Sequence, residues 1–178
     1  MNQSNNHLRE YIYIAILCSQ GIILGIIEQA FPPIFPFAPG AKLGLANLIT
    51  VISLFTLPIS DCVLLLYLRL VLTALISGGA SLFLYSLAGS TLSFIAMLIV
   101  KKCYPKFMSI IGISIVGGAF HNLGQLLIAI WLAQAPSLIL YLPVLTIMGI
   151  LSGTLIGICS KFLLNHVQNF NFINSKLH

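Results

Sequence analysis

Three polar side chains that could contact a ligand stand close together in the stretch GGAFHNLGQLLIA, residues 117–129. His121 and Gln125 are four residues apart, so they share one face of a helix, and Asn122 lies beside that face. Polar groups inside an apolar segment are expensive to bury, so each one indicates either a bonding partner or a function. The pattern predicts ligand contact by these three residues. The alternative is that His121 only bonds a neighbouring helix.

Three further polar residues lie in the first three apolar segments of the chain. Glu28 is near the end of the first segment, Asn47 is in the second and Arg69 is inside the third. We expect Glu28 and Asn47 to line the same ligand site, although Glu28 could instead form an ion pair with Lys42 at its rim. For Arg69 the expected role is structural, a bond to backbone carbonyls or to Glu28.

Lys42 follows a proline-glycine turn at 39–40 and is expected in the first turn of a helix. At such a position the free N–H groups and the positive end of the helix dipole face the same way as the lysine ammonium. A phosphate or carboxylate group of a ligand would offset this unfavourable arrangement. The alternative is that Lys42 extends its side chain to the lipid headgroups.

The composition places these residues in a membrane protein. The 178 residues are 59% hydrophobic and 6% charged, with a mean hydropathy of +1.08, whereas about a quarter of the residues in a soluble domain are charged. The net charge of +5 comes from residues at the ends of apolar segments, so it indicates membrane orientation rather than nucleic-acid binding. No metal, disulfide or cofactor is expected, because the four cysteines lie far apart: Cys18, Cys62, Cys103 and Cys159.

Six apolar segments approach the roughly 20 residues that a helix needs to cross a bilayer. Turn signals separate the segments, and Pro58 divides the second from the third. We therefore expect an all-α integral membrane protein, with a single membrane domain over residues 1–178 and six transmembrane helices. The expected helices cover about residues 10–31, 42–57, 59–77, 81–100, 109–133 and 139–164.

The basic residues predict how these helices are oriented. Cytoplasmic loops of membrane proteins carry an excess of Lys and Arg, and an N-terminus on the inside places these basic residues there: Arg9, Lys101, Lys102, Lys106, Lys161 and Lys176. Both termini are then cytoplasmic in a multi-pass protein of the cell membrane, and Lys42 faces out. The polar residues collect in the outer half, which predicts a cavity open to the outside with loop 32–41 as its cover.

Two stripes of glycine could bring helices close together. Gly149, Gly153 and Gly157 form a double GxxxG pattern in the last segment, and Gly21 and Gly25 are four residues apart in the first. Small residues at this spacing let helix backbones approach one another inside a membrane. The stripes predict packing within the bundle, or else docking of a separate membrane protein.

The stretches PGAKLGLANLIT (39–50) and GGAFHNLGQLLIA (117–129), within a six-helix chain of this length, resemble a family of bacterial membrane proteins. It is the Gx transporter family, also labelled heptaprenyl diphosphate synthase component I, which is similar to the substrate-binding S components of energy-coupling factor transporters. The resemblance implies an S-component-like bundle with a ligand pocket near the outer face and the first loop as its lid. It also implies a transmembrane coupling subunit and a pair of ATPases as partners.

The synthase in that label is not matched by catalytic residues in this chain. Prenyl synthases that elongate chains hold diphosphates through Mg²⁺ on two aspartate-rich motifs, and Mg²⁺ needs oxygen ligands. The chain has one aspartate, Asp61, which is expected to cap a helix, and two glutamates, Glu10 and Glu28. It has no DDxxD, no Walker A motif and no Ser-His-Asp or Cys-His arrangement. We therefore expect that it is not an enzyme.

Three functions remain open from the sequence. The first is the substrate-binding membrane subunit of an importer of the energy-coupling factor type, which captures a small anionic or amphipathic molecule at the outer face. The second is a noncatalytic membrane component of polyprenyl (heptaprenyl) diphosphate or quinone metabolism, and the third is a membrane scaffold without a ligand. An occupied outer pocket favours the first, altered prenyl synthase activity on co-expression the second, and a bundle without a pocket the third.

Overall fold

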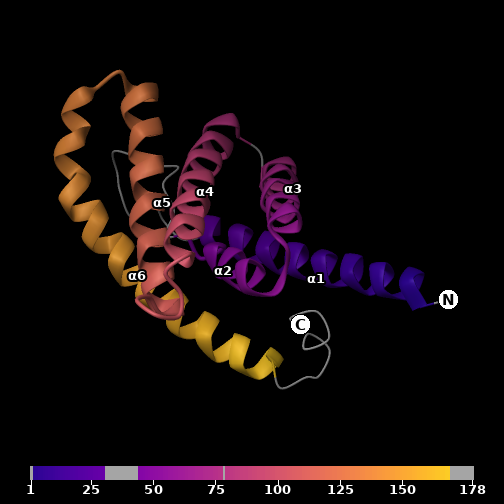
Figure 1. The fold of residues 1–178 in the computed structure, drawn as a ribbon. Coiled ribbons are helices and arrows are strands. Elements are labelled where there is room, and N and C mark those ends of the chain that lie inside the picture. Colours follow the sequence, from indigo (N-terminus) through magenta and orange to yellow (C-terminus); the bar gives the residue numbers. More distant parts are fainter. Residues whose placement is uncertain (1, 31–43, 78, 169–178) are drawn as a thin grey trace.

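A computed structural model describes residues 2–30, 44–77 and 79–168 of the chain, and these residues form helices and no strands (Figure 1). Five helical stretches are long and apolar enough to cross a membrane, as expected for a multi-pass membrane protein. The expected all-helical bundle is therefore confirmed, although the second helix is too short to be a sixth full span. The elements are α1 (Asn2–Ala30), α2 (Asn47–Thr56), α3 (Ile59–Ser77), α4 (Ala80–Lys101), α5 (Ile110–Ala133), the 3₁₀ turn η1 (Pro136–Tyr141) and α6 (Leu142–Gln168).

The predicted break at Pro58 is present, and it separates α2 from α3. The predicted start of the second helix at residue 42 is wrong, because α2 begins at Asn47. Gly44 has a φ of 84°, a left-handed conformation that glycine adopts readily and that does not continue a right-handed helix. The backbone turns at this point, with the Asn47 N–H donating to the Gly44 carbonyl at 2.8 Å. The remainder of that expected helix, including Lys42, lies outside the described residues.

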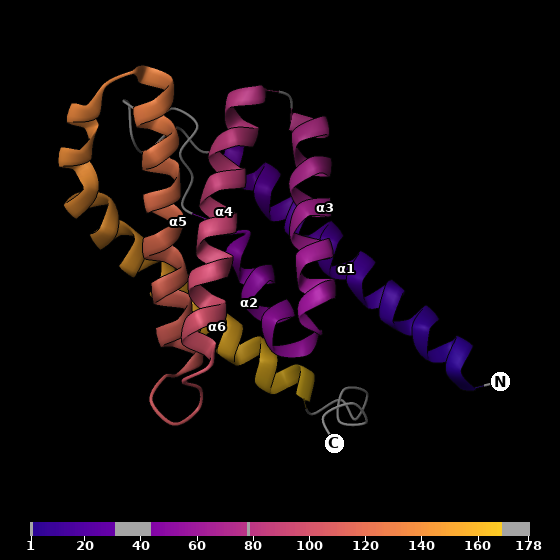
Figure 2. The same cartoon turned by 45° about the horizontal axis from the view of Figure 1, so that its top comes forward.

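Helix α2 is half as long as a membrane span. Its 10 residues extend for about 15 Å at about 1.5 Å per residue, against a hydrocarbon thickness of about 30 Å. Since α2 ends beside Pro58, at the turn into α3, its N-terminus lies near the middle of the bundle. Figure 2 shows α2 as a short helix inside the bundle, and it contacts α6 and α1 as well as α3, α4 and α5. Asn47 is thus expected about halfway through the bilayer that the bundle spans.

The C-terminal end of α2 is fixed by residues at the end of α4. The Lys101 ammonium donates a hydrogen bond to the Leu54 carbonyl and lies 5.2 Å from the centre of the Phe55 ring. The Tyr104 ring packs edge-on against Phe55, with 5.1 Å between the ring centres. A cation at a helix C-terminus complements the helix dipole and the unpaired carbonyls there. These contacts hold α2 in place, and through it the position of Asn47.

Helices α5 and α6 are in backbone contact along the glycine stripe of α6. A Cβ atom added to Gly149 would lie 2.6 Å from the Gly118 carbonyl oxygen, and one added to Gly153 would lie 2.6 Å from the Ser114 carbonyl oxygen. A Cβ on Gly157 would lie 2.8 Å from the Ile111 Cα. The described structure therefore uses this stripe for packing inside the bundle, the first of the two alternatives predicted from the sequence.

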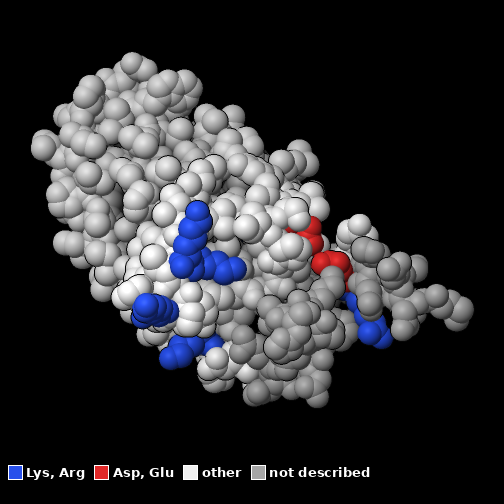
Figure 3. Space-filling view, in the orientation of Figure 1, with Lys and Arg blue, Asp and Glu red and all other residues white. Residues whose placement is uncertain are grey.

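The two ends of the bundle differ in charge. In Figures 1 and 2 the turn from α4 to α5 and the N-terminal end of α1 lie toward one end, and the α3–α4 connection and η1 lie toward the other. Lys and Arg side chains on the face shown in Figure 3 gather over the first of these ends. Arg9, Lys102, Lys106 and Lys161 are exposed. A cytoplasmic location for this basic end stays a prediction of the positive-inside rule.

Candidate functional site

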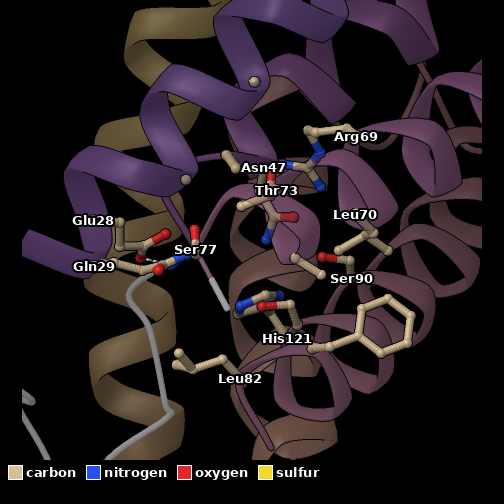
Figure 4. Close-up of a pocket in the computed structure, with 17 residues that line it drawn as sticks. Glu28, Gln29, Asn47, Arg69, Leu70, Thr73, Ser77, Leu82, Ser90 and His121 are labelled. Atoms are coloured by element: carbon tan, nitrogen blue, oxygen red, sulfur yellow. Dashed lines mark hydrogen bonds between the residues drawn. The ribbon is translucent and has the colours of Figure 1, made fainter. Parts of the chain in front are cut away.

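A cavity whose wall combines apolar surface with several polar side chains lies between α1, α3, α4 and α5, next to the N-terminus of α2 (Figure 4). Helices α1, α3 and α4 contribute most of the cavity wall, and α5 contributes His121. The cavity extends from mid-membrane depth, at Asn47, toward the end of the bundle opposite to the basic one. Its described lining consists of Gly21, Gly25, Glu28, Gln29, Gly44, Ala46, Asn47, Arg69, Leu70, Thr73, Ala74, Ser77, Leu82, Phe83, Ser86, Ser90 and His121.

Polar side chains line this cavity at helical spacing. On α3, Arg69, Thr73 and Ser77 follow one another at intervals of four residues, and on α4 Ser86 and Ser90 are also four apart. Residues at this spacing lie above one another on a single face of a helix. The two polar faces meet at the cavity, while the opposite faces of α3 and α4 carry exposed apolar side chains such as Leu75 and Ile95. The polar residues of these two faces are thus directed at the cavity.

Glu28 is buried and holds the backbone that leads into α2. Its Oε1 atom accepts hydrogen bonds from the N–H groups of Gly44 and Leu45, the second at 3.3 Å. A carboxylate in this place also complements the positive end of the α2 dipole. The structure thus assigns Glu28 a structural contact just before α2, in addition to its place in the cavity wall.

Asn47 is the first residue of α2, and its side chain is 4% exposed. Neither its Oδ1 nor its Nδ2 atom has a hydrogen-bond partner in the described structure, and the residue lines the cavity. A buried polar group without a partner costs about 1–3 kcal/mol. Both a donor and an acceptor are therefore directed into the cavity and available to a ligand or to water.

His121 and Gln125 lie together, as their spacing predicts, and both are buried. The His121 Nε2 atom and the Gln125 amide nitrogen are 3.0 Å apart, a hydrogen bond in which the amide donates when Nε2 carries no proton. The His121 ring lies between two glycines, because a Cβ on Gly44 would be 3.0 Å from its Cδ2 and one on Gly89 would be 2.9 Å from its Cε1. Gln125 supports the imidazole from outside the cavity wall.

Asn122 does not line the cavity, contrary to the expectation for the His121–Asn122 pair. Its Nδ2 atom donates to the Leu145 carbonyl of α6 at 2.8 Å. Consecutive residues of a helix point about 100° apart, so Asn122 is directed at α6 when His121 is directed at the cavity. The sequence interpretation placed Asn122 beside the face of His121 and expected ligand contact from both, and the α5–α6 contact separates their roles.

Arg69 is a cavity residue that the sequence interpretation treated as structural. Its side chain is 3% exposed, and its Nε atom has no hydrogen-bond partner in the described structure. Figure 4 shows Arg69 and Glu28 entering the cavity region from different sides, from α3 and α1. The signal in the sequence was its position, ten residues into an apolar helix, with Thr73 and Ser77 on the same face.

The glycines of α1 make room for side chains of α3. A Cβ atom on Gly21 would collide with the Cδ atom of Arg69, and a Cβ on Gly25 would lie 3.3 Å from the Thr73 Cγ2 atom. The Gly21–Gly25 pair thus contacts α3 inside the bundle and also forms part of the cavity wall. Lys42 and loop 32–41, the remaining predicted parts of the site, lie outside the described residues.

Comparison with known protein families matches residues 17–163 to the family described as heptaprenyl diphosphate synthase component I. No curated protein and no solved structure matches the chain. The matched residues include the cavity wall from Gly21 to His121 and both glycine stripes. The matched range covers most of the 178 residues, and the chain therefore belongs to the heptaprenyl diphosphate synthase component I family.

Proposed function

We propose that this protein captures a small polar molecule in the cavity beside α2 and acts as the substrate-binding subunit of an importer in the cell membrane. The observation that carries the proposal is the group of buried polar atoms without hydrogen-bond partners in one cavity: the Asn47 amide, the Arg69 Nε and the Ser77 hydroxyl. Buried polar atoms are nearly always paired. A set of unpaired ones directed into one space is expected where a ligand completes the bonds.

The half-length of α2 supports the same proposal. Membrane transporters bind substrates near the middle of the bilayer, where interrupted helices expose their N-termini to the ligand. Irregular backbone at membrane depth is tolerated where it lines a cavity. The backbone around Gly44, followed by Asn47 at the start of α2, has these features. A scaffold without a ligand gives no reason for a short helix that begins beside unpaired polar groups.

An importer of the energy-coupling factor type uses separate subunits for energy. The sequence of this chain contains no Walker A motif and so offers no phosphate-binding loop for ATP. In the proposed assembly, a transmembrane coupling subunit and a pair of ATPases supply the energy, and this chain supplies the substrate specificity without catalysing a reaction. The exposed apolar faces of α1 and α6, with Ile23 and Leu155 among their residues, offer surfaces for lipid or for such a subunit.

A second function is favoured by the description of the matched family. A component I implies a partner component, and the description points to heptaprenyl diphosphate synthesis. In this alternative the chain is a noncatalytic membrane component that holds a soluble synthase near the lipid bilayer, where its long apolar product accumulates. The polar cavity then has no direct part in the function.

Native mass spectrometry of the protein released from mild detergent or lipid nanodiscs separates the two functions. The importer proposal predicts an additional small mass on the wild-type protein. The same mass is expected on Thr154→Val, a control on the exposed face of α6, where Thr154 bonds its own helix. It is expected to be missing from Asn47→Leu, which keeps the volume of the side chain but removes both unpaired polar atoms.

Two results would contradict the importer proposal. One is an absence of any small adduct from wild-type protein prepared from cells in both rich and minimal medium. The other is an adduct that persists unchanged in Asn47→Leu while the variant remains folded. Co-purification of a soluble prenyl synthase, with a change in its activity when the membrane chain is present, would support the alternative function.

A further inference from the structure

The strongest electrostatic feature of the cavity is the side chain of Arg69. It is the tenth amino acid residue after the start of α3 at Ile59, which places it about 15 Å along the helix and close to mid-membrane depth. A cation at this depth is costly unless it is paired or faces a polar cavity. Its Nε atom has no hydrogen-bond partner in the described structure, and the residue lines the cavity. The guanidinium is therefore incompletely satisfied by the described protein groups.

Glu28 is the described acidic residue of the cavity, but it does not complete the bonding of Arg69. Both side chains line the cavity, from α1 and α3 (Figure 4). The Glu28 carboxylate, however, accepts hydrogen bonds from the N–H groups of Gly44 and Leu45, next to the positive end of the α2 dipole. These Glu28 hydrogen bonds go to the backbone before α2 and not to the Arg69 Nε atom, which has no hydrogen-bond partner in the described structure. Arg69 remains a donor for one additional anionic group.

We propose that the recognised group of the ligand is a single carboxylate, bound between the Arg69 guanidinium and the Asn47 amide. This inference rests on the proposed substrate-binding function and names the class of substrate. An arginine guanidinium presents parallel N–H groups that match the two oxygens of a carboxylate. The Asn47 Nδ2 atom supplies a further donor, and its Oδ1 atom accepts from a neighbouring hydroxyl or amine of the ligand.

The charge of the described cavity wall favours a carboxylate over a diphosphate. A diphosphate brings several negative charges, and the described wall offers one arginine against them. The hydroxyl groups of Thr73, Ser86 and Ser90 suit hydrogen bonds to an uncharged polar body.

The probes for this inference are acetate, its neutral and nearly isosteric analogue acetamide, and inorganic diphosphate. Saturation-transfer NMR on the full chain in nanodiscs gives a dissociation constant for each. Acetate is expected to bind wild-type protein at least tenfold more tightly than acetamide or diphosphate. Arg69→Met is expected to raise the acetate dissociation constant at least tenfold and to leave the acetamide constant unchanged. Arg9→Met, the same change at an exposed arginine, is the matched control and should bind acetate as the wild type does.

If Arg69→Met does not fold, a second variant still tests whether Arg69 contacts the carboxylate. In Gly21→Ala the new methyl group collides with the Arg69 Cδ atom, so the guanidinium shifts while its charge stays in the protein. This variant is also expected to weaken acetate binding at least tenfold. Equal acetate binding in wild type and in a folded Gly21→Ala variant, with Arg69 displaced, would count against a direct contact.

The remaining outcomes separate this inference from the proposed function. Binding of acetate and acetamide with equal affinity overturns the carboxylate site, but a small molecule retained in native mass spectrometry would leave substrate capture standing. Tighter binding of diphosphate than of acetate overturns the inference, because the site would then recognise a phosphate group rather than a carboxylate. If no probe binds and no small molecule is retained, both the carboxylate site and the substrate-binding function are wrong.

Discussion

Glycine does two different things in the two halves of this bundle. Between α5 and α6, Gly118, Gly149 and Gly153 bring two backbones into direct contact, because added Cβ atoms would meet main-chain atoms of the facing helix. Between α1 and α3, Gly21 and Gly25 face the side chains of Arg69 and Thr73. The first contact leaves no space, and the second leaves room for polar side chains that line a cavity.

The comparison shows that two glycines spaced four residues apart do not by themselves predict whether backbone or a side chain of the next helix lies against them. The glycine stripe of α6 meets main-chain atoms of α5 and forms a rigid contact, as expected for membrane helices. A glycine stripe that faces a long polar side chain makes room for that side chain at mid-membrane depth. The α5–α6 contact thus joins two helix backbones rigidly, and the α1–α3 contact leaves room for Arg69 and Thr73 at the cavity.

The largest expected effect is on stability, at the backbone contact between α5 and α6. In Gly118→Ala the added methyl group would collide with the Gly149 carbonyl, a main-chain atom that cannot rotate away. We expect the free energy of unfolding in detergent to fall by about 3 kcal/mol, the upper part of the usual range for overpacking. Gly112→Ala is the control, because its nearest side-chain contact is the flexible Met108 at 3.4 Å. Equal stability of the two variants would mean that the α5–α6 backbones are not in contact.

The next effect distinguishes the two polar neighbours on α5. His121→Ala removes a side chain of the cavity wall, so it is expected to weaken ligand binding by about 2 kcal/mol, within the usual range for an unpaired polar group. Asn122→Ala removes the bond to the Leu145 carbonyl and should lower the free energy of unfolding by about 1 kcal/mol. Ligand titration and thermal unfolding of both variants test this. The assignment fails where Asn122→Ala weakens binding as strongly as His121→Ala without loss of stability.

A smaller effect is expected at the α1–α3 contact. In Gly21→Ala the methyl group meets the flexible side chain of Arg69 rather than backbone. We expect a tenfold loss of ligand affinity, which is about 1.4 kcal/mol, and a change in the free energy of unfolding of less than about 1 kcal/mol. Stability and affinity are measured on one preparation. A collapse of the fold comparable with that of Gly118→Ala would remove the distinction between the two glycine contacts.

The smallest effect is expected at Lys42, which lies outside the described residues. As a cation near the outer surface it would attract an anionic ligand only weakly, because solvent and salt screen its charge. Lys42→Gln is expected to reduce ligand affinity by about 0.5 kcal/mol at low salt, with no loss of stability and no effect at high salt. Unchanged affinity together with altered lipid dependence would instead support contact of Lys42 with lipid headgroups.

Helical composition and most helix boundaries could be predicted from the sequence, because apolar length and turn residues are local properties. The helix at Ile59–Ser77 has the expected bounds, and the break at Pro58 is where a proline should place it. The shortness of α2 was harder to predict. It depends on the left-handed turn at Gly44 and on the Glu28 carboxylate, which comes from a different part of the chain.

The candidate site was also predicted only in part, because relations within one helix can be read from the sequence and relations between helices cannot. The i, i+4 spacing brought His121 and Gln125 together, since a single helix fixes their relation. Whether Asn122 faces the cavity or α6, and whether Arg69 bonds protein or ligand, depends on which helices are neighbours. Those neighbours are set by the glycine contacts of the whole bundle, which no single segment reveals. The polar face of α3 could be recognised in the sequence, because Arg69, Thr73 and Ser77 are spaced four residues apart.

An experimental density map of the protein in nanodiscs, at a resolution that resolves side chains, tests the central claim most directly. The central claim is that the cavity beside α2 binds a small molecule through Asn47 and Arg69. The map of the wild-type protein should contain compact density between these two side chains that the protein does not account for, and this density should be missing from Asn47→Leu. A wild-type map in which the Arg69 guanidinium bonds only protein groups, with the cavity closed around it, would contradict the account.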